Sequence, residues 1–151
     1  MNAIARIKAC TEKKIYLGNL RAKRDWGFAP EYIEAMWQML QQPLPDDFVV
    51  ATGEAYSVEE FLKEAFEYAG FGDWKSYVEI DQRYFRPAEV EVLIGDARKA
   101  NERFGWEPKI KCKDLVKVMI DSDFRAIGLT PPGEGDKLLN EKFPNRWWKV
   151  D

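Results

Sequence analysis

Residues 29–42 carry apolar positions at helical spacing. Pro30 suits the first turn of a helix, and Pro43 ends the pattern. The apolar positions fall on one face, which consists of Ile33, Met36, Trp37 and Leu40. We expect this face, Trp37 included, to be buried in the core, because an amphipathic helix packs its apolar stripe inward.

Other stretches repeat the helical pattern. Residues 57–70 begin with Ser57 and Glu60 at the spacing of a capping box. Residues 112–129 also place apolar side chains at helical intervals, and Phe66 follows Leu62 by four residues, so we expect Phe66 in the core. The remaining predicted helices are short, at residues 3–10 and 96–105.

The predicted strands are few and short. Residues 14–18 and 77–80 indicate short strands, and the β-branched run at residues 48–52 predicts a buried strand. Residues 84–96 are expected to be extended, because Pro87 keeps the residue before it out of the helical region.

The order of these elements predicts an α/β fold, an α+β-like lobe with a small sheet and several helices. We expect residues 1–151 to form a single lobe, with residues 130–151 as an extended C-terminal tail because they are rich in Pro, Gly and charge. Trp147 and Trp148 either hold this tail down or dock onto a partner. The strands are too few for an independent doubly wound sheet, so part of the sheet is expected from a missing neighbour.

Composition narrows the classes of function. The 151 residues are 46% apolar and carry a net charge of −3, so we expect no binding to nucleic acid or to an anionic membrane. The absence of histidine excludes Ser-His-Asp and Cys-His catalysis within the chain and argues against a transition-metal site. Two cysteines, with no apolar run of membrane-spanning length and no signal-peptide pattern, indicate a cytoplasmic protein.

Cations gather in "LGNLRAKRDWG", residues 17–27, at the turn after a predicted strand. Arg24 could hold a phosphate with paired N–H donors there, aided by the positive N-terminus of the following helix. The alternative, which the local sequence alone favours, is that Arg21, Lys23 and Arg24 are solvated loop charges.

A second candidate lies in "YFRPAEVE", residues 84–91. Arg86 lies in an extended segment that could present it to a ligand, and Glu89 could accept both hydroxyls of a ribose. The alternative is an Arg86–Glu89 surface ion pair of little energetic value. Trp26 and Trp106, beside these segments, are candidates to line a cleft.

Two motifs are absent from the sequence. No GxGxxG or GxxGxxG occurs, so there is no dinucleotide-binding fingerprint, and no tyrosine is followed four residues later by lysine. The 151 residues therefore contain neither a recognisable cofactor site nor a phenol–ammonium pair on one helical face.

Four stretches together resemble the GDP-mannose 4,6-dehydratases, which are extended short-chain dehydrogenases/reductases. They are "LGNLRAKRDWG", "FVVATGEAYSVEEF", "YFRPAEVEVLIGDARKA" and "FGWEPKI", and the resemblance runs through nearly the whole chain. It implies the carboxy-terminal, substrate-binding part of such an enzyme, with the Rossmann half missing through truncation, a mis-called start or a split gene. Tyr56 and Phe28 stand where the family usually has His.

The resemblance also implies roles for individual residues. Arg24 and Arg86 would lie near the diphosphate of GDP-mannose or a related GDP-sugar, and Glu89 near its ribose. Asn19 and Lys23 are secondary candidates for contacts near the nucleotide. The complete enzyme, a lyase of deoxysugar and GDP-fucose biosynthesis, would use NADP to make GDP-4-keto-6-deoxymannose.

For the chain alone, the resemblance implies no catalytic residue, no bound cofactor and no activity. Apolar surface that the Rossmann half would cover is expected to cause self-association. The alternatives are a non-catalytic nucleotide-sugar-binding module and a fragment of a sister epimerase or reductase.

Overall fold

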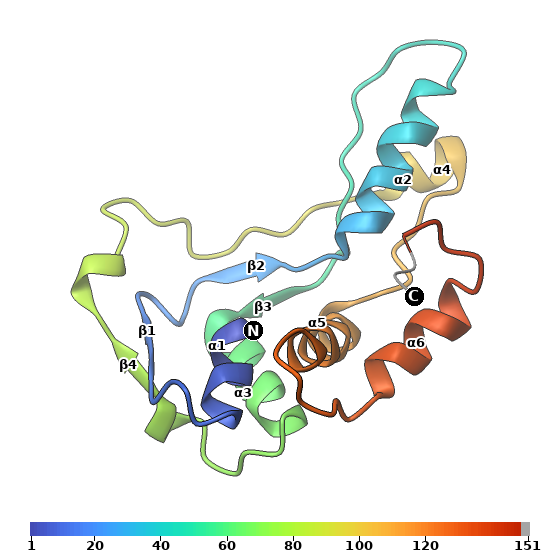
Figure 1. The fold of residues 1–151 in the computed structure, drawn as a ribbon. Helices are drawn as coiled ribbons and strands as arrows, with labels where there is room; N and C mark the ends of the chain where they lie inside the picture. The colour runs from blue at the N-terminus through green and yellow to red at the C-terminus, as the bar shows by residue number, and fades with distance from the viewer. Residues whose placement is uncertain (149–151) are drawn as a thin grey trace.

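A computed structural model describes residues 1–148 (Figure 1). Its helices are α1 (Asn2–Lys8), α2 (Ala29–Leu40), α3 (Val58–Tyr68), α4 (Arg98–Phe104), α5 (Cys112–Ala126) and α6 (Glu134–Lys142). Its strands are β1 (Ile15–Leu17), β2 (Lys23–Asp25), β3 (Ala55–Ser57) and β4 (Val78–Ile80), with 3-10 turns η1 (Lys75–Tyr77) and η2 (Gln82–Tyr84). The predicted mixed α/β fold with small sheets and several helices is confirmed. In this part of the chain no helix combines the length and the apolar character needed to cross a membrane.

The strands form two separate two-stranded sheets. β1 pairs in parallel with β4, and β2 pairs antiparallel with β3, which sets Arg24 opposite Tyr56. On its other edge β2 forms a single parallel bridge, between Lys23 and Val92. The segment that follows η2 therefore runs alongside β2 on its way to α4 (Figure 1).

The main hydrophobic core lies between α1, α3 and α5. Its fully buried apolar side chains include Ile4, Phe66, Val116 and Ile120. The ring of Phe66 lies 5.4 Å from that of Phe71 and 5.6 Å from that of Tyr77, measured between centroids. The predicted core position of Phe66 is confirmed, and so is the capping box that begins α3 at Ser57.

The predicted extended tail contains a helix, α6. Its N-terminus is held by Asp121, a fully buried residue of α5 that accepts the backbone N–H groups of Gly133 and Asp136, each at 3.2 Å. The hydroxyl of Tyr68 donates to the same carboxylate at 3.0 Å, and burial together with this bond raises the pKa of Tyr68 to about 12. The local sequence pattern did not predict α6 because its N-terminal partners come from α3 and α5.

The apolar face predicted for residues 29–42 is exposed, which makes the predicted burial of Trp37 wrong. Ile33, Met36, Trp37 and Leu40 are 50%, 58%, 62% and 82% exposed. α2 projects away from the main core (Figure 1) and buries its other side, where Ala35 packs against Trp106. An apolar stripe predicts that a helix packs against something but does not identify the partner.

Glu31 anchors the start of α2 to the loop before α5. Its buried carboxylate accepts the N–H groups of Lys109 and Ile110 at 2.6 and 3.1 Å, and its carbonyl accepts the indole N–H of Trp106 at 3.0 Å. Burial raises the pKa of Glu31 although these backbone donors lower it. The contacts fix α2 relative to the rest of the chain without using its apolar stripe.

Residues 48–52 are not in a strand, contrary to the prediction. The segment descends from the tip beyond α2 to β3 (Figure 1), with Val49 exposed and Ala51 and Thr52 buried. A β-branched run forms a strand only where a neighbour offers hydrogen bonds, and no ladder partner lies beside it within residues 1–148.

Candidate functional site

Three predicted site residues meet in one hydrogen-bonded group, which we call the clamp: Asn19, Arg24 and Glu89. The guanidinium of Arg24 donates through Nη2 to Oε1 of Glu89 at 2.9 Å, and the amide of Asn19 donates to Oε2 at 3.2 Å. Nη1 of Arg24 also donates to the carbonyls of Lys23 and Val90, at 2.7 and 2.9 Å. The clamp thus joins the loop after β1, strand β2 and the segment alongside β2.

The clamp is largely shielded from solvent. The side chains of Arg24 and Glu89 are 23% and 20% exposed, so water screens their attraction less than in a surface pair. Glu89 pairs with Arg24, and the alternative of an Arg86–Glu89 surface pair is therefore wrong. The interpretation of Arg24 as a solvated loop charge is also wrong, because its guanidinium donates three hydrogen bonds to acceptors in β2 and in the adjoining segment.

The other two predicted residues lie outside the clamp. Lys23 is exposed, and its backbone links β2 to the neighbouring segment through bonds to Glu91 and Leu93 of 2.7 and 3.0 Å. Arg86 is exposed, and it forms no ion pair or side-chain hydrogen bond with other residues of the described part, 1–148. The structure therefore does not bring Arg86 and Arg24 into one contact group.

Two hollows lie beside the clamp and share Asn19 and Arg21. The larger, of about 540 Å³, is also lined by Trp74 and Phe85, and the smaller, of about 340 Å³, by Lys23. A third hollow, of about 600 Å³, lies between α2 and the C-terminal segment, and none of the predicted site residues lines it. The space next to the predicted residues is therefore on the Asn19 side of the clamp.

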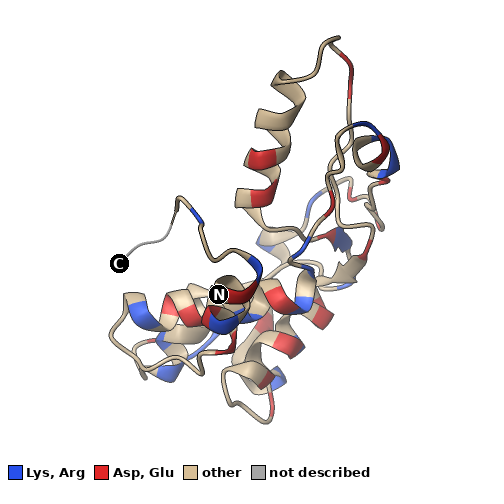
Figure 2. Cartoon of the chain, turned by 90° about the vertical axis from the view of Figure 1, so that its right-hand side faces the viewer, with Lys and Arg blue, Asp and Glu red and all other residues tan. Residues whose placement is uncertain are grey.

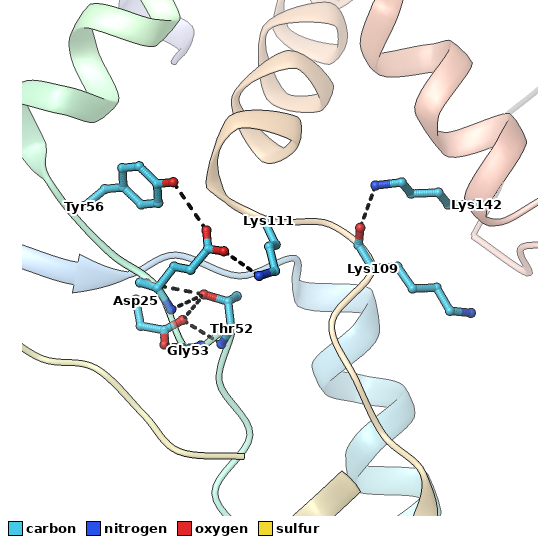
Figure 3. Close-up of polar contacts among 8 residues, drawn as sticks. Asp25, Thr52, Gly53, Tyr56, Lys109, Lys111 and Lys142 are labelled. Carbon is cyan, nitrogen blue, oxygen red and sulfur yellow. Dashed lines mark hydrogen bonds and ion pairs between the residues drawn. The ribbon is translucent and has the colours of Figure 1, made fainter. Parts of the chain in front are cut away.

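Asp25 is a polar residue that the sequence motifs did not single out. Its Oδ1 accepts the backbone N–H and the hydroxyl of Thr52, at 2.8 and 2.6 Å. Its Oδ2 accepts the N–H group of Gly53 at 3.0 Å (Figure 3). The same oxygen accepts the N–H group of Gly95 at 3.3 Å. The sequence feature that could have pointed to Asp25 is its position as the single acid in the cationic stretch of residues 17–27, directly after Arg24.

Tyr56 and Lys111 converge on the carboxylate of Glu54. The hydroxyl of Tyr56 donates to Glu54 at 3.3 Å, and the ammonium of Lys111 forms an ion pair with the same side chain. Burial, and then the negative charge of Glu54, raises the pKa of the Tyr56 phenol. The phenol is therefore a hydrogen-bond donor at neutral pH, and this group connects β3 to the start of α5 (Figure 3).

Of the two tryptophans proposed to line a cleft, Trp26 serves in packing, whereas Trp106 packs and also lines a further hollow, of about 460 Å³, with Gly53 and Gly95. Trp26 stacks on Phe61 with 4.6 Å between ring centroids and donates its indole N–H to the carbonyl of Tyr56 at 3.2 Å. Trp106 is 4% exposed and packs against Ala35. Neither ring lines the two hollows beside the clamp. Trp148, in the tail, packs against Phe28 and Phe143.

Comparison with solved structures shows a shared fold. The structure of RMD from Pseudomonas aeruginosa, complexed with NADPH, superposes with a TM-score of 0.71 at 20% identity and covers 83% of this chain and 41% of its own. UDP-glucose 4-epimerase from Bifidobacterium longum, in complex with NAD+ and UDP, superposes with a TM-score of 0.63 at 18% identity over 95% of this chain and 39% of its own. The lobe thus corresponds to about two fifths of each of these proteins.

Comparison of sequences shows the family. The family model described as GDP-mannose 4,6 dehydratase matches residues 1–119. GDP-mannose 4,6 dehydratase 2 of Arabidopsis thaliana is 60% identical over 121 residues, which are 80% of this chain and 32% of that protein. The chain spans about a third of the length of the curated relatives that it matches. This chain belongs to the GDP-mannose 4,6-dehydratase family.

Proposed function

We propose that this lobe is the substrate-binding part of a GDP-mannose 4,6-dehydratase and that the clamp holds the diphosphate and ribose of GDP-mannose or a related GDP-sugar. The observation that carries the proposal is the convergence of Asn19 and Arg24 on Glu89, from positions 70 and 65 residues away in the sequence. In a member of this family, a shielded guanidinium beside a carboxylate suits a nucleotide sugar.

The clamp retains hydrogen-bonding capacity for such a ligand. A guanidinium has five N–H donors, and three hydrogen bonds from Arg24 to protein acceptors leave two for phosphate oxygens. The carboxylate of Glu89 has about four acceptor positions and accepts two bonds, from Arg24 and Asn19. It can therefore accept ribose hydroxyls while it still holds Arg24.

Arg86 has a different role in this proposal. It is exposed and lies three residues before Glu89, so it can approach the diphosphate from the solvent side. Lys23, exposed beside the smaller hollow, adds positive charge near the nucleotide. Together with Arg24 they would offset the charge of the diphosphate in a chain of net charge −3.

In the whole protein, NADP supplies the hydride chemistry that converts GDP-mannose to GDP-4-keto-6-deoxymannose. The Pseudomonas protein was solved with NADPH and the Bifidobacterium protein with NAD+ and UDP, which supports a nucleotide cofactor and a ligand with a nucleoside-diphosphate part. Residues 1–151 contain no glycine fingerprint, so we assign the cofactor to the part of the protein outside this sequence. The lobe contributes binding energy that orients the hexose.

The 151-residue chain is expected to show no dehydratase turnover, because its binding groups are not accompanied by a recognisable cofactor site. The measurement is incubation of the chain with GDP-mannose and NADP, followed by chromatography or proton NMR for the 4-keto product. The full-length Arabidopsis relative serves as the positive control. Formation of the product by the chain alone would contradict the proposal.

The exposed face of α2 suits the missing nucleotide-binding half. Residues 35–45 contain no charged side chain, and Figure 2 shows the outer part of α2 without Lys, Arg, Asp or Glu, whereas α3, α4, α5 and α6 each carry charges of both signs. Val49, on the segment beside it, is also exposed. We propose that α2 and residues 48–52 pack against that half in the whole protein, where the β-branched run gains a strand partner.

Without such a partner, the same face is expected to cause self-association of the isolated chain. The double variant Trp37→Ser/Leu40→Ser should shift the mass measured by light scattering toward the monomer. Ile80→Ser is the matched control, because Ile80 is 59% exposed and lies in β4, away from α2. A monomeric wild-type chain, or an equal shift for the control, would contradict this assignment.

A further inference from the structure

We propose that Asp25 is a positioning residue for the clamp, one that fixes the register in which Arg24 meets Glu89. The expected effect of Asp25 on ligand binding rests on the proposed function. Its effect on the contact between Arg24 and Glu89 concerns the lobe alone. Asp25 follows Arg24 in β2, and successive side chains of a strand point to opposite faces. Asp25 therefore acts on the clamp through the backbone and not by contact with the ligand.

The carboxylate of Asp25 joins β2 to two other segments of the lobe. It accepts two bonds from Thr52 and one from Gly53, which ties β2 to the turn before β3, and one from Gly95, at the end of the segment that carries Glu89. β2 also holds that segment by two backbone bonds, both made by Lys23. Arg24 adds the two clamp bonds, to Glu89 and Val90. The bond from Gly95 to Asp25 is a further connection, placed two residues along β2 from the bridge.

The position of Gly95 supports the same conclusion. A Cβ at residue 95 would lie 2.3 Å from the Cβ of Ala51 and 3.2 Å from Cγ1 of Val49. Only a residue without a side chain lets the backbone come this close to residues 49–51. The close approach brings the N–H of Gly95 within reach of Asp25.

The clamp depends on this register. Arg24 donates both to the side chain of Glu89 and to the carbonyl of Val90, so its guanidinium is fixed by two adjacent residues of the segment. A slip of one residue along a strand displaces its groups by about 3.3 Å, which exceeds the tolerance of a hydrogen bond. Loosening the Asp25 contacts should therefore separate Arg24 from Glu89.

The test uses the 151-residue chain with GDP as the probe. Asp25→Asn keeps the shape of the side chain but replaces an accepting oxygen with an NH2 group, which cannot accept the N–H groups of the turn or of Gly95. We expect the dissociation constant for GDP, measured by NMR titration, to rise on the order of tenfold, because misplacing a binding group weakens an oriented interaction. The side-chain N–H signals of Arg24 should also lose their protection from exchange with water.

Asp121→Asn is the matched control. Asp121 also accepts backbone and hydroxyl donors, but those donors hold α6, away from the clamp. The control should lower the melting temperature while it leaves GDP affinity and the Arg24 signals unchanged. A merely structural role for Asp25 would give the same result as Asp121→Asn.

A folded Asp25→Asn variant with wild-type GDP affinity and protected Arg24 signals would overturn the inference. If this variant does not fold, Thr52→Val decides, because it keeps the backbone N–H bond from residue 52 to Asp25 and removes the hydroxyl bond of 2.6 Å. The other bonds that it removes are two longer ones between the hydroxyl and the backbone of Glu54, of 3.3 and 3.4 Å. A smaller loss of both readouts is then expected, and no loss would overturn the inference. If the proposed function is wrong, Arg24→Ala will leave GDP affinity unchanged. In that case the exchange protection of the Arg24 side-chain signals in Asp25→Asn still tests the role of Asp25.

Discussion

The Arg24→Ala variant is expected to bind GDP about 10- to 150-fold more weakly than the wild-type chain. Removing a hydrogen-bonding group that contacts a charged ligand costs about 1.5–3 kcal/mol, and each 1.4 kcal/mol corresponds to about a tenfold change in affinity. The variant also leaves Glu89 without its cation, so the carboxylate would face the diphosphate unpaired. Calorimetry or NMR titration with GDP measures the effect, in the chain and in a reconstructed full-length enzyme.

Arg125→Ala is the matched control for this prediction. Arg125 also forms an ion pair, with Asp136, but the pair lies between α5 and α6. Its loss should leave GDP affinity unchanged. If Arg24→Ala and Arg125→Ala have equal effects on GDP binding, the assignment of Arg24 to the diphosphate is wrong.

The Phe66→Ala variant is expected to lose about 3–5 kcal/mol of its free energy of unfolding, the range for removal of a large aromatic side chain from a packed core. Phe66 is fully buried, and its ring contacts Phe71 and Tyr77 within the core between α1, α3 and α5. A domain has about 5–15 kcal/mol in total, so such a loss should leave the chain close to unfolding. Urea denaturation followed by circular dichroism measures the change.

Phe85→Ala is the comparison variant for the core. Phe85 is 42% exposed, and a surface substitution of this kind is expected to change stability by about 0.5 kcal/mol or less. A similar loss in the two variants would show that the core around Phe66 does not dominate the stability of the lobe.

Local sequence signals predicted several elements correctly because short-range physics decides them. The capping box of Ser57 and Glu60 needs only residues of the first turn, and it begins α3 as predicted. The glycine at the end of α4, Gly105, adopts a left-handed backbone with φ of 70°, a conformation that glycine tolerates best. The short strands β1 and β4 also lie within the predicted ranges.

The predictions that failed depended on partners distant in the sequence. The stripe of α2 that includes Trp37 is exposed although its spacing is typical of a core helix, and residues 48–52 lack a ladder partner in the described part, 1–148. α6 was missed because Asp121 holds its N-terminus from another helix. In each case the sequence pattern showed which structure or packing a segment can adopt, whereas a neighbour distant in the sequence determined which one it adopts.

In the candidate site, too, the sequence predicted some features and the tertiary structure determined others. The sequence predicted Arg24 and Glu89 because their residue types suit a diphosphate and a ribose, and the family resemblance added Asn19. The tertiary structure alone decided that Glu89 pairs with Arg24 instead of Arg86, and that Asp25 holds the segments that carry them. The physical reason is that side-chain chemistry is a local property of the chain, whereas an ion pair of 2.9 Å between residues 65 apart exists only after β2 and the segment beside it have been brought together.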